Sequence, residues 1–481
     1  MNKLISGVAL SVVIGLSLTG QAPMAQASQA STVQASTEVS FQDEQLEKAI
    51  KNRLNKSVDE AVFQRDLEAL TSINLYGQGI KSLEGLQYAT NLTYLKVFNT
   101  EVEDLSPLSA LTKLKGLNLN ANRIASIEPL ASLTALEELQ LSGNKIASID
   151  VVKQFPELRY FEANENEIAD IQALSTATQL EVLEVSGNPI ADVKSIVNLP
   201  NLVYLGISNT QISDLSVLKP LSNNLRGLHI AGNRISDLRD LGEMTKLMTL
   251  YADNNQIEDI TPLRNMKDMS SLNLRSNRIY DLEPLRPLTK IANLYLDHNR
   301  IWNIGPLKNH KFDTHYDTGA LLYGLTLSNN YLDLRTNTQS YQLLQKLAGD
   351  GHQLSQLQAE RLVIGSTTAY AGESSYKIDT APFLHNSRTY VPVRFVAERL
   401  GANVAWDKRK HTVTITKGDR TIRWVVGQKQ ATVNGKAVAF DAPPLLRNQR
   451  TFVPVRFVSE LLASDVEYVS SYRSVLIFEK K

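Results

Sequence analysis

Apolar residues recur along most of the chain at intervals that fit neither a helix nor a strand for long. Residues 114–130 read LKGLNLNANRIASIEPL. Leu117 and Leu119 alternate with polar residues, as in a short strand. Ile127 and Leu130 stand three residues apart, as apolar side chains do in a 3-10 helix. The stretch therefore predicts a short strand, a turn and a tight helical segment.

This pattern repeats every 22 residues, with one step of 23, and gives about twelve copies. Its asparagine column runs through Asn122, Asn144, Asn166, Asn188, Asn233, Asn255, Asn277 and Asn299, with Thr100 and Thr210 substituting twice, Gln78 in a weaker first copy and Asn330 in the last. One copy buries too little apolar surface to fold alone, so the copies must stack as coils of a solenoid. The asparagine amides are expected to satisfy backbone groups between coils.

Two amphipathic segments flank the repeats and predict caps. FQDEQLEKAIKNRLNK places Leu46, Ile50 and Leu54 on one helical face. TQSYQLLQKLAGDG predicts a closing helix with a glycine stop. We therefore assign residues 41–70 to an N-terminal helical cap, 71–335 to the repeats, and 336–362 to a C-terminal cap and linker.

The first residues predict export. The chain starts MNK, continues through LISGVALSVVIGLSLTG and reaches Ala25-Gln26-Ala27, which is the layout of a signal peptide over residues 1–27. Residues 28–40, rich in Ser, Thr and Gln, predict a disordered spacer. We expect a secreted, extracellular or envelope-associated protein with no transmembrane segment in the mature chain.

Composition narrows the possible partners. Lys plus Arg and Asp plus Glu each number 50, so no global field favours nucleic acid, and no such partner is expected. The chain has no cysteine, which excludes disulfides, thiolate metal sites and a lipoprotein anchor. Any binding partner must therefore be recognised by a local patch of the surface and not by the net charge of the protein.

The repeat L-x-x-L-x-L-x-x-N-x-I-x-x-I-x-P-L, the helical cap and the signal peptide resemble those of the bacterial internalin-type leucine-rich-repeat proteins. The resemblance covers residues 41 to about 350. It implies an α/β fold, a right-handed solenoid with a parallel sheet on its concave side and 3-10 segments on its convex side. In this family the concave face binds protein ligands, so the resemblance implies the same role here.

Outward-facing strand positions give candidate ligand-binding residues, because exposed aromatic residues beside charged ones are typical of protein interfaces. They are Tyr94, Phe98, Glu138, Tyr160, Glu162, Glu184, Tyr204, His229, Tyr251 and Tyr295. Glu138, Glu162 and Glu184 come from consecutive coils, about 5 Å apart by strand spacing, and are expected to form an acidic patch. The alternative is that these are ordinary solvent-facing positions of a curved sheet.

One segment offers a metal-dependent alternative. NHKFDTHYDTG gathers His310, Asp313, His315 and Asp317, all potential metal ligands. Their spacing matches no metal motif, and the glycine is misplaced for a calcium loop. We therefore expect a polar insertion, and no metal, other cofactor or catalytic residue.

A different duplication follows the repeats. APFLHNSRTYVPVRFVAERLGANVAW, from Ala381, is echoed 62 residues later by PPLLRNQRTFVPVRFVSELLASDVEY. Pro392 suits the start of a helix and Gly401 its end, while HTVTITK, RTIRWVVG and KAVAF alternate as strands. The pattern predicts a small α+β domain with a strand-helix-strand duplication.

Residues 363–481 resemble the copper amine oxidase N-terminal-like domain, or stalk domain, of secreted proteins of Gram-positive bacteria, through the repeated R-T-[YF]-V-P-V-R-F-V element. Amine oxidases carry copper in another domain, within a T-x-x-N-Y-[DE] motif. Here Asn330-Tyr331-Leu332 lacks the acid, so oxidase activity is not expected. Four arginines can bind carboxylates or cell-wall polymer, or act as internal ion-pair partners, which we favour: Arg388, Arg394, Arg450 and Arg456.

Together these patterns predict a secreted, non-enzymatic protein that binds a protein ligand through its concave face, in adhesion or recognition. The C-terminal domain is expected to hold it at the cell envelope, with cell-wall polymer as a possible second partner. The alternative is an envelope structural or cell-wall-polymer-binding protein whose repeats have no protein partner.

Overall fold

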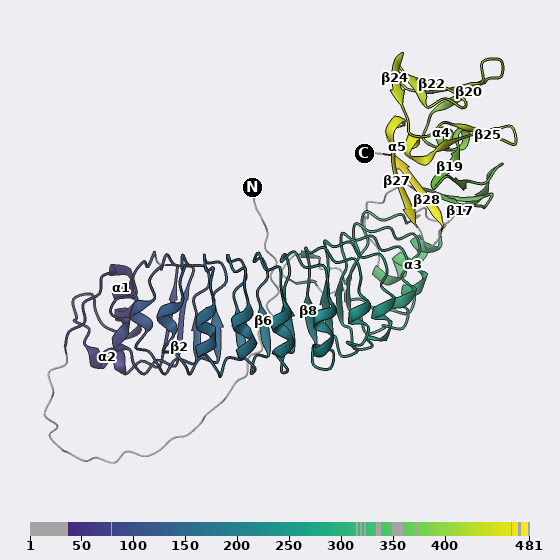
Figure 1. Ribbon diagram of the computed structural model, residues 1–481. Coiled ribbons are helices and arrows are strands. Elements are labelled where there is room, and N and C mark those ends of the chain that lie inside the picture. The colour runs from purple at the N-terminus through teal and green to yellow at the C-terminus, as the bar shows by residue number, and fades with distance from the viewer. Residues whose placement is uncertain are drawn as a thin grey trace, which may run out of the picture.

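The computed structural model describes residues 37–77, 79–313, 316–317, 320–321, 324–332, 338–348, 359–371, 374–462, 464–469 and 473–479. The expected signal peptide 1–27, His315 and Gly349 lie outside them. The chain forms a long curved solenoid with a smaller module at its C-terminal end (Figure 1). Among the described helices, none combines the length and apolar composition needed to cross a bilayer.

One strand from each repeat joins a parallel sheet. Its order is β1-β2-β3-β4-β5-β6-β7-β8-β9-β10-β11-β14, and equivalent residues pair, for example Leu95 with Leu117. The strands are β1 (Ser72–Tyr76), β2 (Tyr94–Phe98), β3 (Gly116–Asn118), β4 (Glu138–Gln140), β5 (Tyr160–Glu162), β6 (Val182–Glu184), β7 (Tyr204–Gly206), β8 (Gly227–His229), β9 (Thr249–Tyr251), β10 (Ser271–Asn273), β11 (Asn293–Tyr295) and β14 (Leu325–Thr326). The insertion before β14 carries the pair β12 (Tyr316–Asp317) and β13 (Ala320–Leu321).

The opposite side of each coil is a 3-10 helix. These are η1 (Leu86–Tyr88), η2 (Ser106–Leu108), η3 (Glu128–Leu130), η4 (Asp150–Gln154), η5 (Gln172–Thr176), η6 (Lys194–Asn198), η7 (Ser216–Leu221), η8 (Arg239–Leu241), η9 (Thr261–Asn265), η10 (Glu283–Leu285) and η11 (Gly305–Leu307). Ile127 and Leu130 are both buried between sheet and helix, as their spacing predicts. The predicted α/β solenoid is confirmed.

A ladder of buried asparagines joins the coils. Asn144 Nδ2 donates to the carbonyl of Leu119 in the preceding coil (3.0 Å) and to that of Leu141 in its own (2.8 Å). Its Oδ1 accepts from the backbone N–H of Ile124 (3.0 Å). The same contacts recur at Asn166 and at later members of the column. The turn therefore leaves few polar groups unpaired in the core.

The N-terminal cap consists of α1 (Glu44–Arg53) and α2 (Gln64–Glu68). Leu46 and Ile50 are fully buried against the first coil. Val39 is buried too, and its N–H donates to the carbonyl of Val62 (2.8 Å). The ordered cap therefore begins before residue 41, within the segment that composition assigns to a spacer, because Val39 has an apolar site to fill.

At the other end, α3 (Gln339–Ala348) closes the solenoid. Leu344 and Leu347 are buried in the same core as the repeats, with Leu343 partly buried beside them. The predicted apolar face therefore covers the last coil.

The C-terminal module is duplicated throughout at an offset of 62 residues. Its first half has β15 (Ala359–Val363), β16 (Thr368–Ala371), β17 (Ser374–Lys377), β18 (Phe383–His385), β19 (Arg388–Pro392), α4 (Val393–Arg399), β20 (Asn403–Asp407) and β21 (Thr412–Lys417). Its second half has β22 (Arg420–Val425), β23 (Gln430–Val433), β24 (Lys436–Ala439), β25 (Leu445–Arg447), β26 (Arg450–Pro454), α5 (Val455–Leu461), β27 (Ser464–Val469) and β28 (Ser474–Glu479).

The two halves exchange strands. One sheet has the order β17-β16-β15-β28-β27 and the other β20-β21-β22-β23-β24, so each takes three strands from one half and two from the other. The central sheet, β18-β19-β26-β25, pairs Val391 with its own equivalent Val453. The module therefore has an approximate twofold axis, and each outer sheet is built from strands of both halves.

The module packs directly against the last repeats. Leu476 of β28 is buried with Tyr280 and Tyr331 of the solenoid, and Trp302 packs against them. The Arg361 guanidinium lies 5.1 Å from the Trp302 ring centroid and 3.8 Å from that of Tyr370. Earlier repeats carry Lys, Glu, Ala or Ser at the positions of Tyr280 and Trp302. These large aromatic residues therefore distinguish the docking coils from the others.

Candidate functional site

The outward face of the twelve-stranded sheet, called here the concave face, carries all ten candidate ligand residues. Tyr94 and Phe98 lie on β2, Glu138 on β4, Tyr160 and Glu162 on β5. The remaining five lie on β6, β7, β8, β9 and β11: Glu184, Tyr204, His229, Tyr251 and Tyr295. Parallel pairing in register places equivalent residues of neighbouring coils about 4.8 Å apart.

Two carboxylates occupy the centre of this face. Glu162 and Glu184 pair in register on β5 and β6. Glu162 accepts hydrogen bonds from the Tyr160 hydroxyl (3.0 Å) and from Ser142 Oγ (2.7 Å). Asn120 Nδ2 also lies 3.5 Å from Glu162 Oε1, and Ser186 Oγ lies 3.4 Å from Glu184 Oε2. Among the described residues, neither carboxylate forms an ion pair with a Lys or Arg.

Three aromatic rings continue the centre toward the C-terminal coils. The Tyr204 hydroxyl lies 2.6 Å from His229 Nε2, and the two rings meet edge to face at 4.7 Å. The His229 ring stacks on Tyr251 at 4.5 Å and 10°. His229 Nδ1 lies 3.7 Å from Glu184 Oε1. Tyr160, Glu162, Glu184, Tyr204, His229 and Tyr251 thus form one continuous group, called here the central cluster.

Burial perturbs the titration of the central cluster. It raises the pKa of Glu184 from 4.5 to about 7, with the charge of Glu162 acting in the same direction. It lowers the pKa of His229 from 6.5 to about 4. It also raises the pKa of the Tyr160 and Tyr204 hydroxyls, as do the neighbouring glutamates. At neutral pH the histidine is therefore neutral, the tyrosines are donors and Glu184 is poised to lose or gain a proton.

Glycines make room for this arrangement. The Glu184 carboxylate lies where a side chain at Gly206 would stand, and the Tyr204 ring lies over Gly227 in the same way. Tyr94 similarly covers Gly116 of the next coil. A larger residue at these positions would displace the side chains that form the face.

An aromatic patch occupies the N-terminal end of the face. Tyr76 is 50% exposed, and Tyr94 and Phe98 are each 36% exposed. Lys96 Nζ lies 4.9 Å from the Tyr76 ring centroid and 5.2 Å from that of Phe98. Exposed aromatic side chains with a charge at their centre are suited to contact another protein.

The C-terminal end of the face is internally paired. Asp297 is buried, bonds Arg275 Nε (3.0 Å) and accepts from the Ser328 N–H (2.8 Å). Asp253 accepts from Asn273 Nδ2 (2.9 Å), and burial raises its pKa. Tyr295 lies among these residues, and burial raises its pKa as well. This end offers a partner fewer open polar groups than the centre.

The expected three-residue acidic patch is wrong in one member. Glu138 pairs in register with Tyr160, whereas Glu162 pairs with Glu184. Glu138 precedes the buried core residue of its strand and the other two follow theirs. It therefore lies two residues earlier along the strand direction, about 6–7 Å from their column.

The candidate metal ligands are not brought together in the part that the structure describes. His310 is buried with its ring stacked on Phe312 at 5.7 Å, while Asp313 is exposed. No described group of three His, Asp or Glu side chains is placed to hold a metal ion. His315 and the Asp317 side chain lie outside the described set.

In the C-terminal module, three of the duplicated arginines form ion pairs within the module. Arg388 Nη2 binds Asp441 (2.9 Å), and its equivalent Arg450 binds Asp379, the equivalent of Asp441. Each pair thus ties one half of the module to the other. Arg394 lies 3.9 Å from Glu398 of its own helix.

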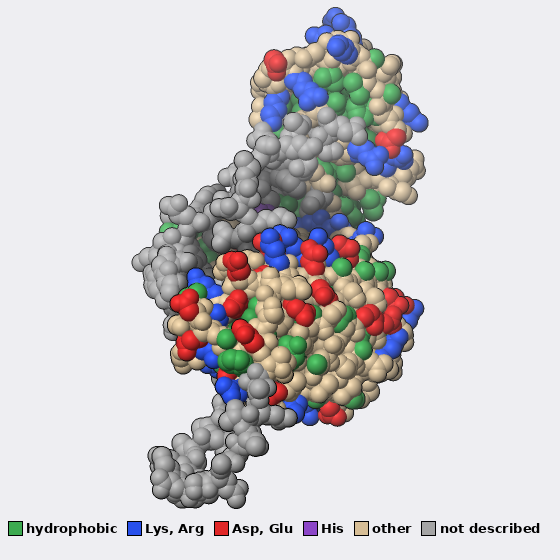
Figure 2. All heavy atoms as spheres, turned by 90° about the vertical axis from the view of Figure 1, so that its left-hand side faces the viewer, with side chains coloured by type: hydrophobic (Ala, Val, Ile, Leu, Met, Phe, Trp, Pro, Cys, Tyr) green, Lys and Arg blue, Asp and Glu red, His purple; other side chains and the backbone are tan. Residues whose placement is uncertain are grey.

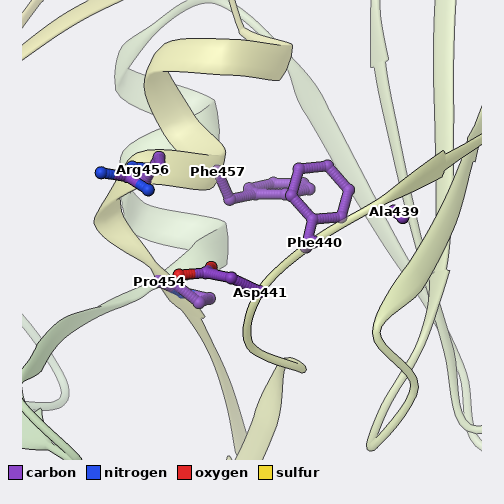
Figure 3. A pocket seen from close by; sticks show the side chains of 6 residues that line it. All are labelled: Ala439, Phe440, Asp441, Pro454, Arg456 and Phe457. Carbon is purple, nitrogen blue, oxygen red and sulfur yellow. The ribbon is translucent and has the colours of Figure 1, made fainter.

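A small cavity of about 120 Å³ lies beside the start of α5. It is lined by Ala439, Phe440, Asp441, Pro454, Arg456 and Phe457, which Figure 3 shows around the first turn of α5. Pockets for small organic ligands usually measure about 300–1,000 Å³. This cavity is therefore too small to serve as such a site.

Family models match both parts of the chain. Leucine Rich repeats (2 copies) match residues 90–132, 178–220 and 223–265, and the Copper amine oxidase N-terminal domain matches residues 363–477. A comparison with curated proteins gives no match. The class of protein is therefore a leucine-rich-repeat solenoid joined to a copper amine oxidase N-terminal domain.

Solved structures narrow the class. An internalin (inlF) from Listeria monocytogenes is 30% identical, with a TM-score of 0.54, over 66% of this chain and 95% of that one. The functional domain of InlJ from the same organism is 15% identical, with a TM-score of 0.49, over 83% of this chain and 97% of that one. The chain belongs to the internalin family of leucine-rich-repeat proteins.

Sequence patterns missed several members of the face. Tyr76 belongs to the weak first repeat, where the register is hardest to follow. Ser142 and the glycines Gly116, Gly206 and Gly227 carry little chemical signal of their own. The signal was nevertheless present, because each of these glycines follows a Tyr or Glu of the preceding coil in the same column.

Proposed function

We propose that this protein is secreted and binds a protein ligand through its concave face, in adhesion or recognition and without catalysis. The observation that carries the proposal is the central cluster. It places two carboxylates and three tyrosines in the middle of a sheet whose two ends are an exposed aromatic patch and an internally paired polar network. The export signal predicted for residues 1–27 supports an extracellular partner.

The chemistry of the central cluster selects the partner's contact residue. The two in-register carboxylates attract a cation, and the surrounding tyrosine rings add cation–π and apolar contact. We infer that a Lys or Arg side chain of the ligand inserts over Glu162 and Glu184. Its charge would favour the ionised form of Glu184, which burial otherwise disfavours.

The membership of the internalin family supports the same surface, since it gives a binding fold with an open sheet. The second candidate function is an envelope structural or cell-wall-polymer-binding role with no protein ligand. The observation that favours it is the basic surface of the C-terminal module, described below.

A site-specific photo-crosslinker tests the proposal. The chain from residue 28 would carry a benzophenone amino acid at Tyr160 on the concave face, or at Gln172 on the exposed convex helix η5 as a matched control. Both proteins would be irradiated with intact cells and secreted fractions, and the crosslinked species identified by mass spectrometry.

We expect one protein species crosslinked from residue 160, absent from the residue 172 sample and displaced by excess unlabelled chain. Glycan adducts from residue 160 in place of a protein would favour the second candidate. Equal crosslinking from both positions would overturn the proposal that the concave face binds a ligand.

A further inference from the structure

We propose that the outer face of the sheet β20-β21-β22-β23-β24, with the Lys408–Lys410 turn, binds an anionic phosphate-bearing polymer of the cell envelope. The outer face is defined by the strand residues that point away from the module core, among them Thr414, Arg423 and Thr432. This inference does not depend on the concave-face ligand. It gives the C-terminal module a binding role of its own.

The twofold duplication gives the module two equivalent outer faces, and only one of them is covered. On the first sheet, Leu476, Arg361 and Tyr370 form a row across neighbouring strands. Leu476 is buried by the solenoid, and Arg361 lies between the rings of Trp302 and Tyr370. This face is occupied by the last repeats of the same chain.

The equivalent row on the second sheet is polar and open. It is Thr414, Arg423 and Thr432, which pair directly across β21, β22 and β23. Arg423 is exposed and both threonines are half-buried. In Figure 1, β20, β22 and β24 lie at the end of the module away from the solenoid, whereas β17 and β28 lie next to it. The open face therefore points away from the repeats.

Basic residues concentrate around this sheet. Residues 403–439 contain eight Lys and Arg but only two acids, Asp407 and Asp419. At one end of the sheet lie Lys408, Arg409, Lys410 and Lys429, all exposed. Lys and Arg side chains are prominent on the face of the module seen in Figure 2, where few acids appear. Among the described residues, no ion pair is found for these four side chains.

Comparing the two halves of the module shows which basic residues the shared fold does not require. The positions equivalent to Lys408, Arg409 and Lys410 in the other half are Ser470, Ser471 and Tyr472, and the position equivalent to Lys436 is Ser374. The fold is common to both halves, so it does not require these charges. Arg423 has an equivalent in Arg361, but the charges of Lys408, Arg409, Lys410 and Lys436 occur only around the sheet that faces away from the solenoid, where a ligand has access.

The surface fits an extended polyanion. The strands of six residues span about 20 Å, with Arg423 between the Lys408–Lys410 turn at one end and Lys436 at the other. Lysines and arginines bind phosphate oxygens, and threonine hydroxyls can donate to phosphates or sugars along the chain. Trp406 on β20 is 36% exposed beside His411, but this edge pair offers little of the apolar surface that inserts into a bilayer or of the stacking platform that binds a run of bases.

Co-sedimentation with purified cell walls tests the inference. The chain from residue 28 would be mixed with Gram-positive walls that retain their phosphodiester polymer and with walls from which hydrofluoric acid has removed it. The test variant is Lys408→Glu/Arg409→Glu/Lys410→Glu. The control is Lys145→Glu/Lys246→Glu/Lys308→Glu, three exposed solenoid residues that give the same change in net charge.

We expect the unaltered chain and the control to pellet with intact walls, and the test variant to bind about tenfold less. Pelleting of the unaltered chain should fall similarly on stripped walls. Equal loss in the control, undiminished binding to stripped walls, or tighter binding to anionic lipid vesicles or duplex DNA of equal phosphate content would each overturn the inference. Circular dichroism and melting of every variant would separate misfolding from lost contacts.

Discussion

A buried asparagine amide satisfies three groups at once in this solenoid. At Asn144 the amide serves two carbonyls and one N–H from two successive coils. Burying these backbone groups without a partner would cost about 1–3 kcal/mol each, so a single side chain stabilises the junction of two coils. Threonine replaces the asparagine at positions 100 and 210, and the Thr210 hydroxyl donates to the carbonyl of Ile207 (2.8 Å).

Replacing Asn144 with alanine should therefore lower the free energy of unfolding by about 2–3 kcal/mol, because the three backbone groups lose their partner. Urea unfolding followed by circular dichroism measures this. Asn198→Ala, at an exposed position on the convex side, is the matched control and should change stability by less than about 0.5 kcal/mol. Equal effects of the two substitutions would contradict the ladder's role.

The central cluster makes a second residue-scale prediction, on pH. Between pH 4.5 and about 7 the unfolded chain has lost the Glu184 proton while the folded protein retains it, so raising the pH favours unfolding. His229, with its lowered pKa, opposes this trend, since lowering the pH from 6.5 to 4 favours unfolding. Glu184→Gln removes only the first contribution.

Relative to the unaltered protein, Glu184→Gln should therefore gain about 2 kcal/mol of stability when the pH rises from 5 to 8. Urea unfolding at both pH values gives this difference directly. Glu128→Gln, an exposed carboxylate on the convex side, is the control and should show no such gain. A stability difference independent of pH would show that Glu184 does not hold its proton in the fold.

Residue columns could be predicted from the sequence, but side-chain contacts could not. The L-x-L register correctly placed Tyr160, Glu162 and Tyr204 on one face. It did not show that Tyr204 would bridge toward His229, because that depends on the space above Gly227 and on the rotamer chosen. The error at Glu138 has a different cause. Glu138 was grouped with Glu162 and Glu184 although it stands before the core residue of its strand and they stand after theirs.

At the scale of elements, the first cap is held by one aspartate. Asp43 Oδ1 accepts from the N–H groups of Gln45 (2.9 Å) and Leu46 (3.1 Å) at the start of α1. Its Oδ2 accepts from the N–H of Lys81 in the first coil (2.7 Å). Burial opposes the charge, but these donors prevail and hold the pKa of Asp43 below its ordinary value.

Asp43→Ala should therefore cost about 2–3 kcal/mol, since both the helix cap and the link to the first coil are lost. The rate of amide hydrogen exchange should rise more in α1 and β1 than in the rest of the chain. Asp59→Ala, an exposed acid in the following loop, is the control and should leave exchange unchanged. Unaltered protection of α1 in Asp43→Ala would rule out this role for the aspartate.

The positions of helices and strands in the C-terminal module could be predicted from the sequence, but the strand that each one pairs with could not. Gly401, with φ at 76°, ends the α4 segment as its place in the sequence indicates. The alternation of HTVTITK predicted β21, yet both halves carry the same alternation. A period of two cannot distinguish pairing within a half from exchange between halves, and the structure has the exchange.

At the scale of the whole molecule, the module is docked through apolar and stacking contacts. Trp302 stacks on Tyr280 at 6.0 Å and 11°, and it meets Arg361 on the module. Tyr280 and Trp302 depart from the small or charged residues of earlier repeats at this position, but the sequence does not show what covers them. Their partner Leu476 follows Trp302 by 174 residues and Tyr280 by 196, separations that no local pattern can predict.

Trp302→Ala should release the module without unfolding either part. The chain has no cysteine, so spin labels at Lys267→Cys and Lys436→Cys report one distance. Pulsed electron paramagnetic resonance should give a narrow distribution of label-to-label distances for the doubly labelled parent and a broad one for the same protein with Trp302→Ala. Trp406→Ala, an exposed tryptophan away from the junction, should keep the narrow distribution. Broad distributions in all three proteins would contradict docking.

The most direct test of the central claim is surface plasmon resonance with the protein partner identified by crosslinking. Glu162→Gln/Glu184→Gln would be compared with Glu128→Gln/Glu243→Gln, two exposed acids on the convex side. We predict a Kd at least about tenfold weaker for the concave pair, with a loss of salt dependence, and an unchanged Kd for the convex pair. Equal affinities for both variants and the parent would contradict recognition through the concave face.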